Sequence, residues 1–341
     1  MKMMKRILVV NVNWVGDVIF SSPVFKALKE AYPQARISCL AVPRVQEVLE
    51  SIPGIDEIIL YDEEGGHKNP FVKLRFIYEL KKRRFDAAFL LHRSLTRALL
   101  VFCAGIPQRI GYDTKRRGVF LTRRIPPATD AIHRCDYYLN VVRSFGIPVK
   151  DGTTSLNVTA DAQTQVKDIL LSHDVKEDDL LVVIHPGGNW NLKRWPKDNF
   201  ILLAQRLSED FQAQVVISGA LQDVPLVEEI ASQLKCRVIV LAGKINLKQL
   251  IALMRRADLV ISADSGPLHI ASSVGSDVIG IFGPTRPEVT GPRGKGRAFI
   301  SFRDVGCNRK PCYYLQCPDN VCMQSVTVKD VLDVVRQIRN P

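Results

Sequence analysis

The stretch that decides the fold is DLVISADSGPLHIASSVGSDVIGIFGP, residues 258–284. Its apolar run at residues 259–261 predicts a buried strand, and Pro267 suits the first position of a helix because its missing N–H needs no partner there. Gly275 favours a left-handed stop before a second strand. The stretch therefore predicts a helix N-terminus at the carboxyl end of a buried strand, where free N–H groups and the helix dipole favour an anion.

Strand and helix patterns alternate along the rest of the chain in two series, with a break in the pattern at residues 150–180. This arrangement predicts an α/β protein with two Rossmann-like, doubly wound domains that face each other across a cleft. We expect an N-terminal domain over residues 1–160 and a C-terminal domain over residues 175–325. A last helix within residues 326–341 is expected to pack back on the N-terminal domain.

Length and composition suit two domains of ordinary size, because the chain has 341 residues of which 46% are hydrophobic. No apolar run reaches the roughly 18 residues needed to span a bilayer. The first 17 residues resemble a signal peptide, but Asn11, Asn13 and Asp17 interrupt the apolar run and no small-residue cleavage site follows. We therefore expect a first strand and a cytoplasmic protein.

Positive charge is concentrated in the first half of the chain. Residues 1–150 contain 25 Lys and Arg against 14 Asp and Glu, a net of +11, so the remaining 22 and 21 leave +1 of the total +12. Such a field favours an anionic partner: nucleic acid, acidic lipid headgroups or a phosphorylated saccharide. A basic surface that only aids solubility is the alternative. We expect no nucleic acid, because no basic motif with interspersed aromatic residues occurs.

A basic amphipathic helix is predicted at residues 71–84, with Phe71, Leu74, Ile77 and Tyr78 on one side and lysines and arginines towards water. Such a helix could rest on an anionic membrane surface. An ordinary solvated helix face is the alternative interpretation.

Four cysteines recur every five residues near the C-terminus, in CNRKPCYYLQCPDNVC: Cys307, Cys312, Cys317 and Cys322. Four thiols so close together could hold a metal ion, but the spacing lacks the paired C-x2-C of a zinc ribbon. Free or redox-active thiols are the favoured interpretation. The other four cysteines are expected to be reduced packing residues.

The first strand leads into a helix through Gly16 and Asp17, and Asp17 falls at the helix N-terminus. Helix capping is the simpler explanation of this carboxylate. A dinucleotide site is disfavoured, because the loop has one glycine where G-x-G-x-x-G needs three.

Four arginines of the first domain are candidates for binding phosphate. Guanidinium groups match phosphate in a bidentate manner, although each of these arginines could equally be a surface charge. The candidates for gripping a substrate phosphate are Arg93, Arg97, Arg116 and Arg117.

Three loops of the second domain follow predicted strands. In HPGGNWNLKRWP (185–196), Gly187 and Gly188 let backbone approach a ligand and Lys193 supplies a point charge. Asp223 follows a glycine turn and is placed to take a ribose diol. The third loop is D-S-G-P-L-H at residues 264–269, for which helix capping is again the simpler interpretation. Together the three loops predict a nucleotide-diphosphate site.

These motifs resemble those of glycosyltransferase family 9. The resemblance covers nearly the whole chain in order and is carried by five segments: Asn13-Trp14-Val15-Gly16-Asp17, FCAGIPQRIGY (102–112), Lys193-Arg194-Trp195-Pro196, Asp264-Ser265-Gly266-Pro267-Leu268-His269 and Gly283-Pro284-Thr285. It implies a GT-B fold and an inverting transferase that needs no metal or other cofactor. The implied reaction moves a heptose from ADP-heptose to the phosphorylated inner-core heptose of lipopolysaccharide. Another acceptor, including that of heptosyltransferase I, stays open, as does a non-catalytic protein that binds a sugar nucleotide.

The resemblance also implies roles for individual residues. Asp17 corresponds to the general base, Lys193 with Ser265 and Gly266 to the diphosphate grip, and His269 to a motif histidine that orders its loop. The implied donor-binding set is Gly187, Gly188, Lys193, Asp223, Asp264, Ser265, Gly266, Leu268 and His269. The implied acceptor-binding set is Asn13, Arg93, Arg97, Arg116 and Arg117. The remaining expected partner is the anionic surface of the inner membrane, bound peripherally on its cytoplasmic face.

Overall fold

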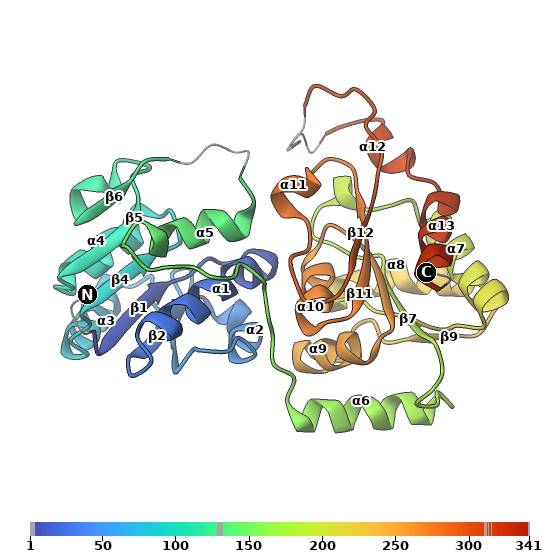
Figure 1. Cartoon of the computed structure of the whole chain (residues 1–341), viewed down its shortest axis with the longest axis horizontal. Helices are drawn as coiled ribbons and strands as arrows, with labels where there is room; N and C mark the ends of the chain where they lie inside the picture. The colour runs from blue at the N-terminus through green and yellow to red at the C-terminus, as the bar shows by residue number, and fades with distance from the viewer. Residues whose placement is uncertain (1–3, 128–131, 310–311, 313, 315, 340–341) are drawn as a thin grey trace. The chain divides into compact units, whose positions relative to one another are not determined.

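The computed structural model describes residues 4–127, 132–309, 312, 314 and 316–339. The chain divides into two compact units, Met1–Ser155 and Leu156–Pro341 (Figure 1). The division falls inside the region where the strand and helix pattern breaks.

The first unit is built on a six-stranded sheet in the order β3-β2-β1-β4-β5-β6, and every neighbouring pair is parallel. Its strands are β1 (Arg6–Val10), β2 (Arg36–Ala41), β3 (Glu57–Leu60), β4 (Ala87–Leu90), β5 (Gln108–Tyr112) and β6 (Arg123–Ile125). The central strands are apolar on both faces, as expected for parallel strands that helices cover on both sides.

Helices cover both faces of this sheet. They are α1 (Val15–Ala31), α2 (Gln46–Glu50), α3 (Pro70–Lys82), α4 (Leu95–Cys103) and α5 (Arg134–Arg143), with the 3-10 turns η1 (Pro43–Val45) and η2 (Arg117–Phe120). Helices α3 and α4 lie together and bury Leu80, Ala98 and Val101 against one face of the sheet. Helix α1 packs against α5.

The second unit repeats the same topology in the order β12-β11-β10-β7-β8-β9, again with parallel pairs. Its strands are β7 (Leu181–His185), β8 (Gln214–Ile217), β9 (Val238–Val240), β10 (Leu259–Ala263), β11 (Asp277–Phe282) and β12 (Ala298–Phe302). Its helices are α6 (Ala160–Ser172), α7 (Lys197–Phe211), α8 (Val224–Ser232), α9 (Leu247–Arg256), α10 (Gly266–Val274), α11 (Pro287–Thr290), α12 (Val321–Gln324) and α13 (Val328–Arg339), with the turns η3 (Asn191–Lys193) and η4 (Leu221–Asp223).

In each unit the direction of winding reverses between two central strands, β1 and β4 in the first and β7 and β10 in the second. The loops that leave the carboxyl ends of such a pair run to opposite faces of the sheet and leave a crevice for a ligand. Most of the loops predicted to carry function follow these four strands, while Asp223 follows β8 and Arg116 and Arg117 follow β5. The topology therefore brings together loops that lie far apart in the sequence.

The last helix, α13, packs on the core of the second unit, whereas we had expected it to pack back on the N-terminal domain. Val331, Leu332 and Val335 belong to the core around α7 and the second sheet, and Trp195 donates its indole N–H to the carbonyl oxygen of Val326 at 2.7 Å. The amphipathic pattern of α13 indicates which face of the helix is buried, but it does not indicate which domain that face packs against. Helix α6, which we had left between the two domains, packs on α9 of the second unit.

Replacing Leu332 by alanine is expected to lower the free energy of unfolding of the second unit by about 2–5 kcal/mol, because it leaves a cavity under α13. Gln337→Ala on the exposed face of the same helix is the matched control and should be close to neutral. Urea unfolding curves of the two variants measure the difference. Equal stability of the two would contradict the assigned packing of α13.

Candidate active site

The candidate site of the second unit centres on Asp264, which follows β10 and is only 4% exposed. The Nζ of Lys193 donates to its Oδ2 at 2.7 Å and to its main-chain oxygen at 3.2 Å. Nε2 of His269 lies 3.3 Å from Oδ1, and the hydroxyl of Thr290 donates to Oδ2 at 3.2 Å. The carboxylate thus joins side chains from η3, α10 and α11.

The Asp264 carboxylate is ionised at neutral pH. Burial alone would raise its pKa, but the hydrogen bond with His269 and the charge of Lys193 outweigh that effect and hold the pKa well below its ordinary value. A fixed negative charge therefore holds the Lys193 ammonium in place. An ammonium has three donors, and Asp264 takes two of them, so one remains for a ligand.

Helix α10 begins beside this pair. Its N-cap residue, Ser265, makes no side-chain capping hydrogen bond within the described part of the chain, and the Ser265 hydroxyl lies 3.0 Å from that of Ser262. The capping interpretation of this loop is therefore wrong for both Asp264 and Ser265. The main-chain N–H groups of Gly266 and Leu268 lie in the first turn, where a helix offers them no partner. Together with Lys193 they form a site for an anion.

Asp223 is a buried residue that stabilises the neighbouring glycine loop, which contains Gly187 and Gly188. It is 2% exposed, and its Oδ2 accepts from the main-chain N–H of Ala220 at 3.0 Å, while its Oδ1 lies 3.6 Å from Nη2 of Arg194. A Cβ on Gly187 would overlap this carboxylate, so that position requires glycine. Arg194 also donates to the main-chain oxygen of Gly188 at 3.0 Å. Asp223 therefore orders the glycine loop, and the ribose contact that we predicted for it stays a prediction.

His185 ends β7 and is a residue that sequence reasoning missed. It is buried, its Nδ1 lies 3.0 Å from the Ser218 hydroxyl, and burial lowers its pKa to about 4. A neutral imidazole therefore joins the loop after β7 to the loop after β8. Its place at the end of a buried strand, just before two glycines, was the available signal.

In the first unit, Asp17 lies in the first turn of α1, after Trp14 as the N-cap residue, and makes no capping contact within the described chain. Its Oδ1 accepts a hydrogen bond of 2.8 Å from the hydroxyl of Tyr138 on α5. Burial, and then the charge of Asp17, raise the pKa of Tyr138 well above its ordinary value, so the phenol stays protonated and keeps donating. Tyr138 was not predicted, because only the fold brings α5 beside α1.

The four candidate arginines fall into two pairs. Arg97 and Arg117 are fully buried and donate to main-chain oxygens, Arg97 to Asn11 at 2.8 Å and Arg117 to Tyr112 at 2.7 Å and to His92. Through these bonds they fix the loops after β1, β4 and β5, and direct contact of either guanidinium with a phosphate stays a prediction. The other two, Arg93 and Arg116, are exposed. Asn13 is half-buried, and its main-chain oxygen accepts from Arg44 at 2.8 Å.

The pKa of His92, which follows β4, reflects the positive charges at the carboxyl edge of the first sheet. Burial, followed by the charges of Arg97 and Arg117, lowers its pKa to about 3, so the imidazole is neutral. Burial also lowers the pKa of Arg117, to about 10, and the guanidinium stays charged. The loops around Asp17 therefore lie in a positive field that favours an anionic ligand.

The eight cysteines are free thiols. Cys312 is buried and its N–H donates to the main-chain oxygen of Pro284 at 2.8 Å, while Cys307 is exposed. Among the residues that the structure describes, no three histidine, cysteine or acidic side chains gather in a way that could hold a metal ion. The described helices likewise include none that is long and apolar enough to cross a membrane.

Comparison with known proteins fits this geometry. The model of glycosyltransferase family 9 (heptosyltransferase) matches residues 73–318. The chain belongs to glycosyltransferase family 9. Lipopolysaccharide heptosyltransferase 2 of Salmonella typhimurium is 27% identical over 299 residues, which is 84% of this chain and 85% of that protein.

Two solved structures share the fold of this family 9 enzyme. A family 9 glycosyl transferase from Veillonella parvula has a TM-score of 0.86 at 24% identity and covers 99% of this chain and 98% of its own. The E. coli ADP-heptose lps heptosyltransferase II has a TM-score of 0.81 at 24% identity and covers 98% of each chain. The protein is thus a glycosyltransferase with the GT-B fold, as the sequence motifs predicted.

Replacing Asp264 by asparagine is expected to lower the free energy of unfolding at pH 7 by about 2–3 kcal/mol, because Lys193 and His269 lose a buried charged partner. The folded-state pKa of Asp264 lies below its unfolded value of about 3.9. Its contribution is therefore complete above that value and is lost as the pH falls through the folded-state pKa.

The difference between wild type and Asp264→Asn should accordingly shrink in acid. Asp258→Asn, a change of the same kind at the half-exposed Asp258, is the control. Chemical unfolding at a series of pH values measures both variants. A difference for Asp264→Asn that is absent at pH 7, or that does not change with pH, would contradict this electrostatic assignment.

Proposed function

We propose that this enzyme transfers a heptose from ADP-heptose to the inner-core heptose of lipopolysaccharide. The observation that carries the proposal is the Lys193 ammonium, which Asp264 holds beside the uncapped N-terminus of α10. That arrangement suits a diphosphate leaving group. Family membership and the relative that is named as a heptosyltransferase support heptose as the sugar.

The second unit supplies the donor site in this proposal. Negative charge grows on ADP as the bond between its phosphate and the anomeric carbon breaks. Lys193 and the N–H groups of Gly266 and Leu268 would stabilise that charge more strongly in the transition state than in the ground state. Because these donors supply the positive charge, we propose a reaction that needs no metal ion.

The first unit supplies the base and the acceptor site. An acceptor hydroxyl loses its proton to Asp17 while its oxygen attacks the anomeric carbon from the face opposite the diphosphate. A new glycosidic bond forms, ADP leaves, and the anomeric configuration inverts. Tyr138 would hold the Asp17 carboxylate in the orientation that accepts the proton. A positioned base of this kind contributes roughly 10²–10⁴-fold.

The exposed arginines Arg93 and Arg116 are the groups that would bind phosphate of the acceptor. Buried Arg97 and Arg117 support this role indirectly, because they hold the loop ends and keep the local field positive. Lipopolysaccharide core is carried on a lipid. We therefore propose that the enzyme acts at the cytoplasmic face of the inner membrane, as a peripheral protein.

The deciding experiment measures ADP release from ADP-heptose with two acceptors. Release that requires a core ending at its first heptose is expected under this proposal. Release only with a heptose-free Kdo acceptor would assign the enzyme to the first heptose transfer instead. Binding of ADP without release from either acceptor would favour another donor or a non-catalytic sugar-nucleotide-binding protein.

Asp17→Asn is expected to reduce kcat by roughly 10²–10⁴-fold while ADP affinity stays unchanged, because the variant loses the base and keeps the donor site. Glu30→Gln, an exposed carboxylate in the last turn of the same helix, is the control and should keep wild-type turnover. Steady-state kinetics and calorimetry give the two quantities. Wild-type turnover of Asp17→Asn would rule out its role as the base.

Lys193→Met is expected to weaken ADP binding by at least about tenfold, because a charge-assisted hydrogen bond is worth roughly 1.5–3 kcal/mol. Lys197→Met is a matched control four residues further on, where an exposed lysine pairs with Glu229. Isothermal titration with ADP measures the dissociation constants of both variants. The assignment fails if the two variants bind ADP equally well.

A further inference from the structure

Helix α3 is apolar on two faces. Its inner face packs on the core of the first unit through Phe76, Ile77 and Leu80. Its outer face carries Phe71, Leu74 and Tyr78, which follow one another at helical spacing and are 80%, 63% and 57% exposed. The sequence pattern had grouped Ile77 with these three, but the structure turns Ile77 inward.

The exposed apolar surface continues onto the neighbouring helix. Leu95, Leu99 and Phe102 lie along the outer side of α4, again three and four residues apart. Of the fifteen exposed large apolar side chains among the described residues, eight lie on α3, α4 and η2. Figure 1 shows α3 and α4 side by side, and the two helices are in contact. We call the six residues Phe71, Leu74, Tyr78, Leu95, Leu99 and Phe102 the α3–α4 patch.

Basic side chains border this patch. Helical spacing places Arg75, Lys81 and Lys82 beside the exposed stripe of α3, and Lys82 Nζ lies 4.3 Å from the centre of the Tyr78 ring. A cavity of about 480 Å³ opens at this end of the helix. Tyr78, Lys81, Lys82 and Arg84 line it together with residues 104–107. An open, basic hollow of this size can accept an anionic headgroup.

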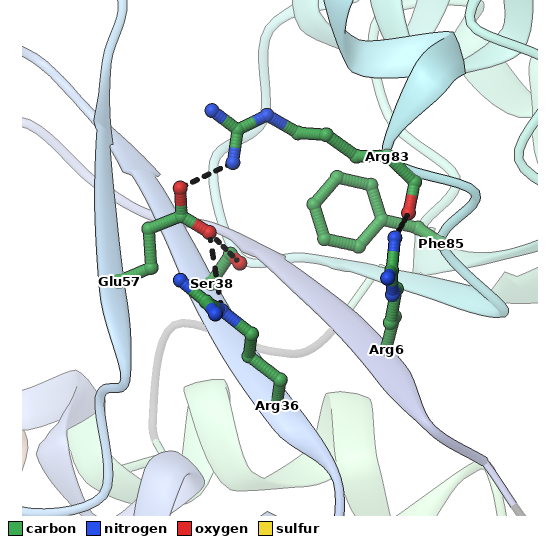
Figure 2. Close-up of a pocket in the computed structure, with 6 residues that line it drawn as sticks. All are labelled: Arg6, Arg36, Ser38, Glu57, Arg83 and Phe85. Atoms are coloured by element: carbon green, nitrogen blue, oxygen red, sulfur yellow. Dashed lines mark hydrogen bonds and ion pairs between the residues drawn. The ribbon is translucent and has the colours of Figure 1, made fainter.

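A second basic cavity, of about 250 Å³, shares Phe85 with the first. Figure 2 shows its three arginines around one carboxylate: Arg83 and Arg36 reach Glu57, and Arg6 donates to the main-chain oxygen of Arg83. Burial would raise the pKa of Glu57, but the hydrogen bond from Arg83 prevails and lowers it, so Glu57 is ionised. The cavity therefore keeps a net charge of +2.

We propose that the first unit docks on an anionic lipid surface through the α3–α4 patch, with the patch in the interfacial layer and the surrounding lysines and arginines on lipid phosphates. Exposed apolar patches rimmed by polar groups are typical of interaction sites, and basic helices with an apolar face bind anionic membranes. The charge of the first half of the chain, +11 of +12, selects an anionic surface over a neutral one. The inference extends the proposed function, because it rests on an acceptor that is carried on a lipid.

This surface and Asp17 lie on different elements of the first unit. Arg6, Arg36 and Glu57 begin β1, β2 and β3, so the second cavity opens at the amino edge of the sheet. Asp17 lies at the opposite, carboxyl edge, just after β1. Within the patch, Leu95 adjoins the loop at residues 92–94, while Asp17 lies on α1, which packs with α5.

Vesicle flotation of the full chain tests this surface. Wild type is expected to float with phosphatidylcholine vesicles that contain phosphatidylglycerol, and to stay unbound with phosphatidylcholine alone. Phe71→Ser with Leu74→Ser should weaken binding by about tenfold or more, since two apolar side chains leave the interface. Lys81→Glu with Lys82→Glu should do the same, because each lost cation costs about fivefold in binding.

Leu171→Ser with Leu202→Ser removes two exposed leucines of the second unit and is the matched control, which should bind like wild type. Turnover of a lipid-free acceptor should be unchanged in the patch variants, so failure of docking is distinguishable from failure of the transfer reaction. Absence of binding to anionic vesicles, or binding that both patch variants retain, would overturn the proposal. Dimerisation that the patch variants abolish, without vesicle binding, would assign the patch to a second copy instead.

Discussion

The donor half of this enzyme depends on one buried interaction, between the Asp264 carboxylate and the Lys193 ammonium. The Asp264 carboxylate is almost fully buried, and because burial penalises an isolated charge it needs a cationic partner. Paired, the two groups fix the loop after β7 to the loop after β10 across the point where the winding of the sheet reverses. The pair also places a cation beside the free main-chain N–H groups at the N-terminus of α10. Together these groups form the site for an anion.

In both units, buried charged side chains hold the loops that follow the strands, but the charges are opposite in sign. In the second unit buried carboxylates, Asp264 and Asp223, organise the loops. In the first unit buried guanidinium groups, Arg97 and Arg117, hold the corresponding loop ends through main-chain oxygens. In the proposed function, the carboxylates collect N–H donors and a lysine for a diphosphate, and the guanidinium groups surround a phosphorylated acceptor with positive charge. The excess of positive charge in the first half of the sequence agrees with this difference between the two units.

Sequence alone was enough for the architecture and for the residues of the α10 loop, because apolar runs and glycine or proline breaks are local. It did not predict β5 or β6, since QRIGY and RRI are short strands with charged residues and no apolar run. It also did not predict the burial of Arg97 and Asp223 or the packing of α13 on the second unit. Burial of a charged residue and the neighbour of an amphipathic helix are tertiary properties, and the contact of Tyr138 with Asp17, 121 residues apart, is of the same kind.

Amide hydrogen exchange with and without ADP tests the central claim, that the pair of Asp264 and Lys193 builds the nucleotide-diphosphate site at the N-terminus of α10. The account predicts that ADP slows exchange at residues 187–193 and 265–268, whose main-chain groups surround the pair. Protection that appears instead in the loops of the first unit, at residues 11–17 and 92–94, would contradict it. Protection that is absent from both regions at saturating ADP would contradict it as well.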